Sequence, residues 1–457
     1  MSIKDINIHT YSQKFDLPKH YKMEFGAVNT DFKLVNQILN LLPLHLFADP
    51  TLKWLDPCVG SGYFSMVLYK RLFVSLQTQI KSPIKRHNHI INNMIWMIEL
   101  NTNYIPTLYE IFGENANIIC GDFLEYSNLN FDIIIGNPPF NSNGIKKVPT
   151  QKKYNKKTDG KTIWPHFIQN CIVNLKGGGY LAMITPSIWM KRDHSLFNYM
   201  TQWKLLNVNC MTSTETNAIF HKQAQTPTCF FALTKQTNTP NDTLIWDKAL
   251  TRYVPFPISQ ISIPLIAPSI INRLLKWVNI YGHISVIKTS MRPDYKGIFA
   301  VNKCDKEHSF PNISTCRLNK ATSQLIVNYS NKKCPYYGVP KLVLAHKMYG
   351  FPYHDKTGKY GISNRDNYVI LNKTPQQFKQ LQAFLSSKLA FVAYESTRYR
   401  MRFLERYAFE FLPDISVINS FPTNITDETI LDYFNFNDLE RKFIMNITNK
   451  NYTNSFL

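Results

Sequence analysis

Short apolar runs that end in polar or glycine-rich residues alternate with helical patterns through the first half of the chain. Helical apolar spacing covers residues 26–45, the stretch after Phe64, and 164–175. The apolar runs, which we predict as strands, are 53–55, 95–98, 116–120, 131–135, 178–184 and 228–233. Strands that alternate with helices predict a doubly wound, mostly parallel α/β sheet, whose ligands bind beyond the carboxyl ends of the strands.

The alternating pattern weakens after about residue 240 and divides the chain. We predict an α/β domain over residues 1–240 and a linker or irregular connection over 241–270, where four prolines occur. A second domain of mixed α+β character is predicted over 271–457, with a helical stretch from Gln376 to Tyr407 as its clearest element. A chain of 457 residues is long enough for two separate cores.

The charge balance favours a polyanionic partner. Lys and Arg number 52 against 31 acidic residues, which gives a formal charge of +21. A solvated basic surface would explain part of this excess, but nucleic acid is the usual partner of such a chain. No apolar run approaches the roughly 18–20 residues that span a bilayer, and Met1 to Lys22 lacks the apolar core of a signal peptide. We therefore expect a cytoplasmic protein without a membrane partner.

The cysteine pattern favours free thiols over a metal site. Eight cysteines are scattered without Cys-x-x-Cys pairs, so reduced thiols are expected. Cys304, Cys316 and Cys334 with His308 are the best candidate zinc ligands, but their spacing is irregular. We expect no metal.

The run Asn137-Pro138-Pro139-Phe140 follows the strand at 131–135 and is the most specific feature of the chain. Two consecutive prolines have fixed φ and no N–H, so neither a strand nor a helix continues through them. This leaves the Asn137 amide, the Pro138 carbonyl and the Phe140 ring at the carboxyl end of a strand. Two acceptors beside an aromatic ring suit the binding of a planar base by its amino group.

Three earlier strand ends carry groups that suit a nucleoside. Asp56-Pro57-x-x-Gly60-x-Gly62 opens a helix, and its glycines permit a tight turn and a close approach to a ligand, although a plain turn has the same pattern. Glu99 could accept hydrogen bonds from both hydroxyls of a ribose. Asp122 could accept from an adenine amino group while Phe123 covers the ring. The alternative for both carboxylates is a solvated or turn-forming role.

In this order and rough spacing, the motifs resemble those of the class I S-adenosylmethionine-dependent DNA amino-methyltransferases, and among them the gamma-type N6-adenine enzymes of restriction-modification systems. The resemblance covers about residues 22–235. It implies a Rossmann-like methyltransferase sheet followed by a target-recognition domain. It also implies methyl transfer from S-adenosylmethionine to N6 of a flipped-out adenine in double-stranded DNA, without a metal. A separately encoded restriction endonuclease is an expected partner.

The resemblance assigns roles residue by residue. The catalytic residues would be Asn137, Pro138, Pro139 and Phe140. The cofactor would be bound by Thr30, Asp56, Pro57, Gly60, Gly62, Glu99, Asp122 and Phe123. At the first of these positions the family usually has Thr-Pro, whereas this chain has Thr30-Asp31. Phe220 loosely matches the aromatic that packs on the flipped base, and a core phenylalanine is the alternative.

Basic clusters offer candidate contacts to the DNA backbone. A lysine-rich segment at 146–161 directly follows the catalytic run, and a solvated loop is the alternative interpretation. The candidate residues are Lys146, Lys147, Lys152, Lys153, Lys156, Lys157, Arg398, Arg400 and Arg402. Lys341 to Tyr349 and Lys356 to Arg365 add further basic character.

Other acceptors of the methyl group stay open. An RNA adenine and the N4 amine of cytosine present similar amines, and release-factor glutamine methyltransferases use a related Asn-Pro-Pro-Tyr on a protein amide. The phenylalanine at 140, the large C-terminal region and the +21 charge favour DNA. For a fused nuclease, Pro293-Asp294 has no Glu-x-Lys partner nearby, so we expect a methyltransferase alone.

Overall fold

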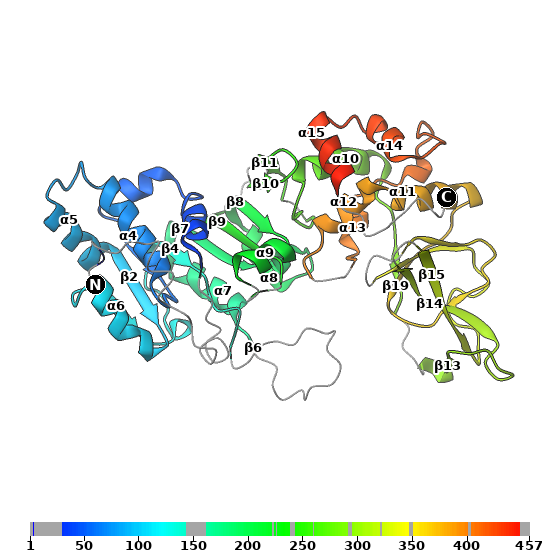
Figure 1. Cartoon of the computed structure of the whole chain (residues 1–457), viewed down its shortest axis with the longest axis horizontal. Coiled ribbons are helices and arrows are strands. Elements are labelled where there is room, and N and C mark those ends of the chain that lie inside the picture. Colours follow the sequence, from blue (N-terminus) through cyan, green and yellow to red (C-terminus); the bar gives the residue numbers. More distant parts are fainter. Residues whose placement is uncertain are drawn as a thin grey trace. The chain divides into compact units, whose positions relative to one another are not determined.

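The computed structural model groups the chain into two compact units (Figure 1). The first unit comprises Met1–Ile245 and Pro255–Gln260, and the second comprises Trp246–Val254 and Ile261–Leu457. The residues that the structure describes are 3, 30–142, 161–221, 224, 226–237, 243–258, 260–290, 295–319, 322–346, 351–400 and 404–447. The division between the units falls within the stretch predicted as a connection.

A nine-stranded sheet has the order β11-β10-β8-β9-β7-β4-β1-β2-β3. Its strands are β1 (Trp54–Asp56), β2 (Ile95–Glu99), β3 (Asn117–Cys120), β4 (Phe131–Gly136), β7 (Leu175–Pro186), β8 (Trp203–Met211), β9 (Thr228–Thr237), β10 (Thr243–Asp247) and β11 (Arg252–Phe256). Strand β1 pairs in parallel with β2 and β4, while β9 runs antiparallel between β7 and β8. The chain order reverses between β1 and β4, which makes their carboxyl ends the topological switch point where ligands bind in open α/β sheets.

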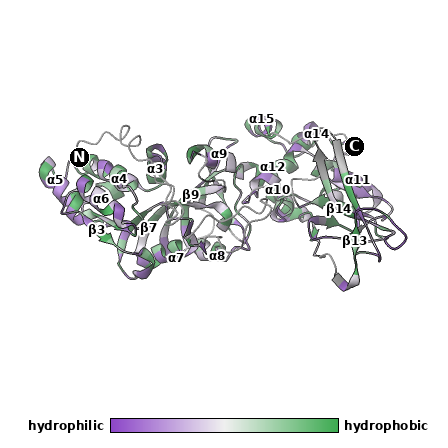
Figure 2. Cartoon of the chain, turned by 60° about the horizontal axis from the view of Figure 1, so that its bottom comes forward, coloured by the Kyte–Doolittle hydropathy of each residue, from purple (hydrophilic) through white to green (hydrophobic). Residues whose placement is uncertain are grey.

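Helices surround the first-unit strands and account for their burial. The helices are α3 (Phe32–Leu39), α4 (Tyr63–Ser75), α5 (Pro83–His89), α6 (Ile105–Phe112), α7 (Trp164–Asn174), α8 (Ser195–Thr201) and α9 (Ser213–Ile219). Short helical turns are η1 (Leu44–Ala48), η2 (Ile90–Met94), η3 (Thr102–Tyr104), η4 (Phe123–Glu125) and η6 (Ser187–Met190). All three residues of β1 are buried, as expected for a parallel sheet covered on both faces. On the side visible in Figure 2, α5 and α7 each carry hydrophilic residues.

The structure confirms the predicted α/β fold class. The six predicted strands correspond to β1, β2, β3, β4, β7 and β9, and the predicted helix at 164–175 is α7. The pattern at 26–45 gives a shorter helix, because α3 ends at Leu39 and Pro43 precedes η1. The pattern did not predict β8, and residues 243–256 form β10 and β11 where we predicted a linker or irregular connection.

The second unit is mixed α+β and contains two four-stranded sheets. One has the order β12 (Ile287–Lys288), β19 (Asn367–Ile370), β16 (Lys341–Ala345), β17 (Tyr353–Asp355). The other has the order β13 (Ala300–Val301), β15 (Thr322–Ser330), β14 (Phe310–Asn319), β18 (Gly361–Ile362). The helices are α10 (Pro268–Tyr281), η7 (Tyr295–Gly297), α11 (Pro375–Leu385), α12 (Lys388–Ser396), α13 (Tyr407–Glu410), η8 (Ile415–Val417), α14 (Asp427–Tyr433) and α15 (Asp438–Asn446).

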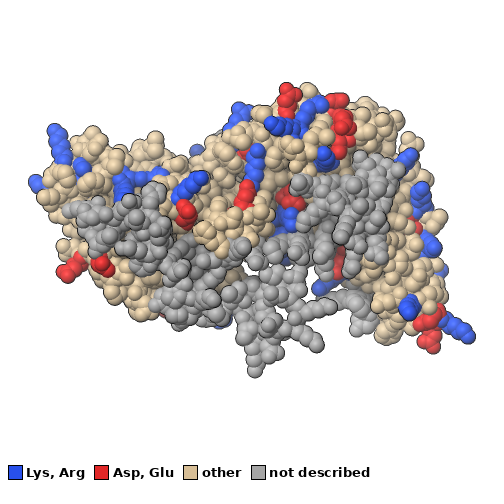
Figure 3. Space-filling model, in the orientation of Figure 1, with Lys and Arg blue, Asp and Glu red and all other residues tan. Residues whose placement is uncertain are grey.

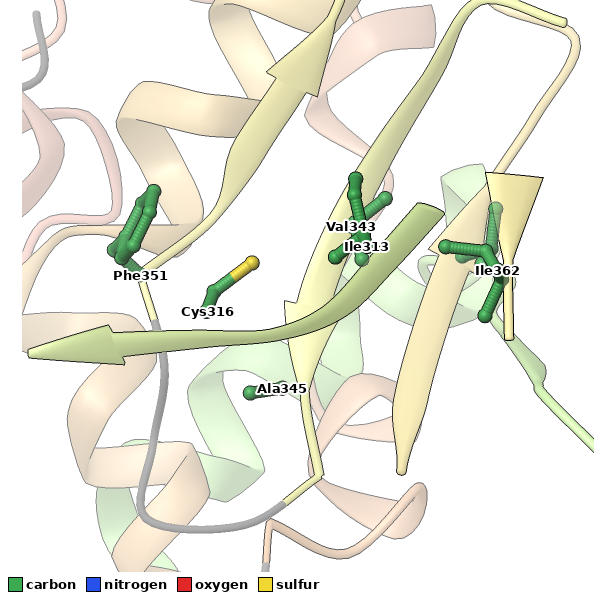
Figure 4. Packing of buried hydrophobic residues seen from close by; sticks show 7 residues of the cluster. Ile313, Cys316, Val343, Ala345, Phe351 and Ile362 are labelled. Carbon is green, nitrogen blue, oxygen red and sulfur yellow. The ribbon is translucent and has the colours of Figure 1, made fainter. Parts of the chain in front are cut away.

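A shared apolar cluster joins the two sheets of the second unit. Figure 4 shows side chains from β14, β16 and β18 gathered around one core. Ile313, Val343 and Ile362 are each 0% exposed, and Phe351 closes the cluster beside Cys316. Burial of several such side chains stabilises the unit by about 1.5–3 kcal/mol each.

Two kinds of feature are absent from the described ranges. In those ranges, no helix is long and apolar enough to cross a membrane. No group of three or more His, Cys, Asp or Glu side chains that could hold a metal ion occurs within the same residues. All eight cysteines are free thiols.

Candidate active site

The turn after β1 brings backbone close to the switch point because two glycines adopt left-handed conformations. Gly60 has φ 54° and Gly62 has φ 90°, and Gly62 directly precedes α4. A Cβ at Gly62 would lie 3.2 Å from Cε2 of Phe112 in α6. Only glycine adopts this backbone without strain, so the two glycines set the tight turn that leads into α4. The Gly62 N–H donates to the Val59 carbonyl at 2.9 Å within this turn.

Glu99, at the end of β2, ties the glycine loop to the neighbouring strand. Its Oε2 accepts a hydrogen bond from the Gly60 N–H at 2.7 Å, and Oε1 accepts from the Asn101 N–H at 2.8 Å. The side chain is 7% exposed, and this burial raises the pKa of Glu99 although the backbone hydrogen bonds oppose the shift. Each oxygen keeps a lone pair that could accept from a ligand hydroxyl.

Asp56 ends β1 and is buried directly beside the end of β4. It is 2% exposed, and burial raises the pKa of its carboxyl group to about 7. Ser65 Oγ donates to Asp56 Oδ2 at 3.2 Å. A Cβ at Gly136 would lie 3.3 Å from Asp56 Oδ1, so a glycine at 136 allows the ends of β1 and β4 to approach this closely.

Of the two polar atoms of the Asn137 side-chain amide, one has a hydrogen-bond partner and the other has none. Its Nδ2 donates to Thr30 Oγ1 at 3.0 Å, while its Oδ1 is buried and has no hydrogen-bond partner. Cys58 Sγ also donates to the Asn137 backbone carbonyl at 3.3 Å, which joins the glycine loop to the Asn-Pro-Pro-Phe run. A buried acceptor without a partner costs about 1–3 kcal/mol, and such an atom at a strand end is a candidate substrate contact.

Phe140 lies shortly before the lysine-rich segment in the sequence. It is half-buried, and its carbonyl accepts a hydrogen bond from Ile163 N–H at 3.3 Å. Strand β5 (Asn141–Ser142) pairs antiparallel with β6 (Lys161–Thr162). The predicted DNA contacts in this segment, Lys146, Lys147, Lys152, Lys153, Lys156 and Lys157, lie outside the described residues.

Asp122 and Phe123 sit at the start of η4 with different exposure. Asp122 is half-buried and its Oδ1 accepts from the Leu124 N–H at 2.9 Å. Phe123 is 1% exposed, and its ring centroid lies 5.7 Å from that of Phe167 in α7. In this arrangement Asp122 is the more accessible of the two, and their predicted contacts with a cofactor stay predictions.

The surroundings of the other predicted residues bear on their proposed roles. Phe220 is 2% exposed, so a base could stack on it only after a rearrangement. Arg398 Nη1 contacts both carboxylate oxygens of Glu395, at 2.9 and 3.0 Å. Arg400 is exposed and Arg402 lies outside the described residues. Lys341, which begins one of the stretches that add basic character, is 0% exposed, so its charge lies in the interior and is not available for a surface contact.

The site also uses residues that the sequence patterns did not single out. Cys58, Ser65 and Asn101 each hold a loop or carboxylate in place. Thr30 was assigned to the cofactor alone, yet it contacts Asn137 from 107 positions away. The sequence offered one signal for Cys58 and Ser65, which is that both lie within ten residues of Asp56.

Residues 58–217 match the family model described as Eco57I restriction-modification methylase. The predicted resemblance to restriction-modification DNA methyltransferases is confirmed. The matched segment contains Gly60, Glu99 and Asp122 as well as the whole Asn137–Phe140 run. No curated protein matches the chain.

Solved structures resemble the chain at low identity. A modification subunit assigned to a type I restriction enzyme of Vibrio vulnificus YJ016 is 12% identical over 48% of this chain and 47% of its own, with a TM-score of 0.35. The type I restriction enzyme EcoKI M protein is 16% identical over 48% of each chain, with a TM-score of 0.35. The type IIG restriction endonuclease BpuSI is 12% identical over 96% of this chain and 62% of its own, with a TM-score of 0.41. The chain thus spans about half the length of the first two.

Proposed function

We propose that this chain transfers a methyl group from S-adenosylmethionine to N6 of an adenine in double-stranded DNA. One observation carries the proposal: Asn137 Oδ1 is a buried acceptor without a partner at the carboxyl end of β4. It lies beside the switch point, where the glycine loop and Asp56 also lie. The match of residues 58–217 to a restriction-modification methylase family supports DNA as the substrate.

The residues at the switch point fit S-adenosylmethionine. Gly60 and Gly62 would pass close to the methionine part, since a Cβ built at Gly60 would meet no atom within 4 Å, and Glu99 has lone pairs for the ribose hydroxyls. Asp122 Oδ1 is used by the backbone, which leaves Oδ2 as the acceptor for the adenine amino group. When bound, this cofactor supplies a methyl group on a positively charged sulfur, which would leave as a neutral thioether without a metal while the methylated amine gives up one proton to water.

The Asn-Pro-Pro-Phe run would activate and position the amine. The lone pair of adenine N6 is delocalised into the ring, so the amine is a weak nucleophile. Asn137 Oδ1 and the Pro138 carbonyl can accept one N–H each, which favours a pyramidal, more nucleophilic nitrogen. The fixed φ of proline sets the direction of that carbonyl. Acceptors that are already fixed in place need no reorganisation during the reaction, so they would lower its barrier by positioning the amine and by electrostatic stabilisation.

The target base would have to leave the duplex to reach these groups. An amino group inside the stack cannot meet the cofactor, so the adenine is flipped out. The half-buried Phe140 ring would stack on the base, and base–aromatic stacking contributes about 1–3 kcal/mol.

The experiment is methyl transfer followed by nucleoside analysis. The purified chain is incubated with labelled S-adenosylmethionine and duplex DNA, and the digested nucleosides are identified by mass spectrometry. N6-methyladenine is the expected product. N4-methylcytosine would assign the other exocyclic amine, and label in RNA or in a protein glutamine amide but not in DNA would refute the proposed substrate. Copurification from the native host would test the expected endonuclease partner.

A further inference from the structure

Two loops of the second unit form a single lysine-bearing surface, which we call the paired-loop surface. It consists of residues 331–340, between β15 and β16, and residues 356–360, between β17 and β18. Lys332 and Lys333 on the first loop and Lys356 and Lys359 on the second are all exposed. Neither loop contains an aspartate or a glutamate, so the surface is positive.

The two loops abut through their glycines. The Gly338 N–H donates to the Gly358 carbonyl at 2.8 Å. Gly358 has φ +69°, and a Cβ there would lie only 2.5 Å from the Gly338 carbonyl carbon. No other residue type fits this position without moving a backbone. The loops are therefore in direct backbone contact.

A buried ion pair beneath the surface fixes the same two loops. Lys341 Nζ lies 2.6 Å from Asp355 Oδ2, and the two side chains are 0% and 2% exposed. Asp355 Oδ2 also accepts from the Tyr360 N–H at 3.0 Å. The remaining hydrogen bonds of Lys341 Nζ go to loop carbonyls, those of Tyr336, Val339 and Tyr360. A buried pair contributes little net stability because desolvation offsets the attraction, but this one holds both loops in one conformation.

The four surface lysines have no acidic partner among the described residues, unlike many basic side chains elsewhere. The paired cases include Lys176 with Asp132, Lys373 with Asp414 and Arg441 with Asp432. On the face shown in Figure 3, Lys and Arg lie beside Asp and Glu in several places. Two of the four lysines instead lie over aromatic rings. Lys333 Nζ is 5.4 Å from the Tyr337 centroid, and Lys359 Nζ is 5.5 Å from that of Tyr360, which restricts their conformations.

We propose that the paired-loop surface binds the phosphate backbone of duplex DNA. Four exposed ammonium groups on a fixed support, without an acidic salt-bridge partner in the described part of the chain, would neutralise phosphates and release counterions. Lysine provides a point charge and reads no sequence from a phosphate, so the surface contributes affinity and orientation. The choice of duplex DNA over other polyanions rests on the proposed function; the fixed cationic surface rests on the contacts above.

The test compares two charge-matched quadruple variants of the full chain. In the first, Lys332, Lys333, Lys356 and Lys359 are changed to Gln. In the control, four exposed lysines elsewhere, Lys85, Lys276, Lys379 and Lys442, are changed to Gln. Binding to a duplex of about 30 base pairs is measured between about 50 and 200 mM salt, the range over which phosphate contacts dominate affinity. Thermal unfolding confirms that both variants are folded.

The expected result is a change in salt dependence that is specific to the first variant. Its slope of log affinity against log salt should fall in magnitude by about 3–4, since each phosphate contact contributes about 0.9, and the control should keep most of the wild-type slope. Methylation at saturating DNA should be unchanged, because these four lysines are not among the residues to which we assign methyl transfer or cofactor binding. Acetylation footprinting adds a direct readout: duplex DNA should protect these four lysines.

Several outcomes would overturn the proposal. Equal slopes in the first variant and the wild-type chain would do so, as would unprotected lysines in the DNA complex. Preferential binding of single-stranded RNA or of anionic vesicles at this surface would reject duplex DNA as its partner. If the wild-type chain binds DNA with the expected lysine dependence but transfers no methyl group, the proposed activity fails while the surface stands. If the wild-type chain methylates DNA but the first variant keeps the wild-type salt slope, the surface proposal fails while the proposed activity stands.

Discussion

The two units place their functional groups by different physical means. In the first unit, Asp56, Glu99 and Asn137 follow the ends of β1, β2 and β4, so backbone pairing in the sheet brings them to one edge. In the second unit, two loops lie together because the buried Lys341–Asp355 pair and a glycine contact hold them. A parallel sheet gathers residues through its topology, whereas a surface made of loops needs specific side-chain contacts.

This difference predicts different consequences of mutation. A substitution at a strand end of the first unit should remove chemistry and leave the fold, because the sheet does not depend on that side chain. A substitution that breaks the support of the paired-loop surface should cost folding free energy, because it leaves a buried charge alone. The following variants test this contrast, from the largest expected effect to the smallest.

Asn137→Ala should produce the largest loss of activity. Removal of a fixed hydrogen-bonding group at a reacting centre costs on the order of 10²–10³-fold in turnover, and the loss of Oδ1 removes one of the two acceptors on the amine. We expect kcat to fall by at least this factor while cofactor binding by calorimetry largely persists. Asn198→Ala, at an exposed position of α8, is the control. Near-normal turnover in the first variant would refute the role of Asn137.

Lys341→Ala should produce the largest loss of stability. It leaves the Asp355 carboxylate buried and unpaired, which costs about 3–5 kcal/mol in the free energy of unfolding. The double change Lys341→Met with Asp355→Leu should restore most of this, since it removes both charges. Urea denaturation measures the effect, with exposed Lys332→Ala as the control. A loss below about 1 kcal/mol would mean that water reaches the pair.

Asp56 should make stability depend on pH. Burial raises the pKa of Asp56 to about 7, whereas an aspartate in an unfolded chain titrates near about 4. The folded state therefore binds the proton more tightly, so the contribution is full below about pH 4 and is lost as pH rises to about 7. Asp56→Asn should be more stable than the wild-type chain at pH 8, by on the order of 2–4 kcal/mol, and similar at pH 4. A difference that does not vary with pH would contradict the buried, protonated carboxyl group.

Thr30→Val should have the smallest of these effects. The valine keeps the shape but removes the acceptor for Asn137 Nδ2, so the amide can rotate and Oδ1 is no longer fixed. Loss of one such hydrogen bond, about 0.5–1.5 kcal/mol, corresponds to about a tenfold fall in kcat at most, and Thr30→Ser should retain activity. In an Asn137→Asp background the same change should matter less, because a carboxylate has two equivalent acceptors. A change confined to the KM for the cofactor would assign Thr30 to cofactor binding alone.

Much of the first unit could be predicted because local pattern and function coincide there. A buried parallel strand is a short apolar run, and the polar residue that follows it is placed by the sheet. The contact between Asn137 and Thr30 spans 107 positions and leaves no local trace. Phe220 shows the opposite case, since a phenylalanine at the end of a short helix has the same local sequence whether it is buried or faces a ligand.

The functional surface of the second unit could not be predicted, because the sequence shows that a residue is charged but not whether its side chain is buried or paired. Lys341 lies in a basic stretch and is buried, while Lys356 from the next basic stretch is exposed. Arg398 belongs to an arginine cluster, yet Glu395 one helical turn earlier neutralises it. Strand β11 was missed for a different reason: Pro255 lies within it, and an edge strand tolerates a residue without an N–H.

The place of β9 has a consequence for how the chain is made. Both neighbours of β8 in the sheet, β9 and β10, are later in the sequence. A nascent chain that has released residues 203–211 from the ribosome therefore holds a strand with nothing to pair with until residues 228–237 follow. During that interval β7 and β8 both present open edges, which are the surfaces that chaperones cover and that aggregation exploits. A pause while residues 212–227 are the last to have left the ribosome should thus lower the yield of folded protein more than a pause after residue 247 has emerged.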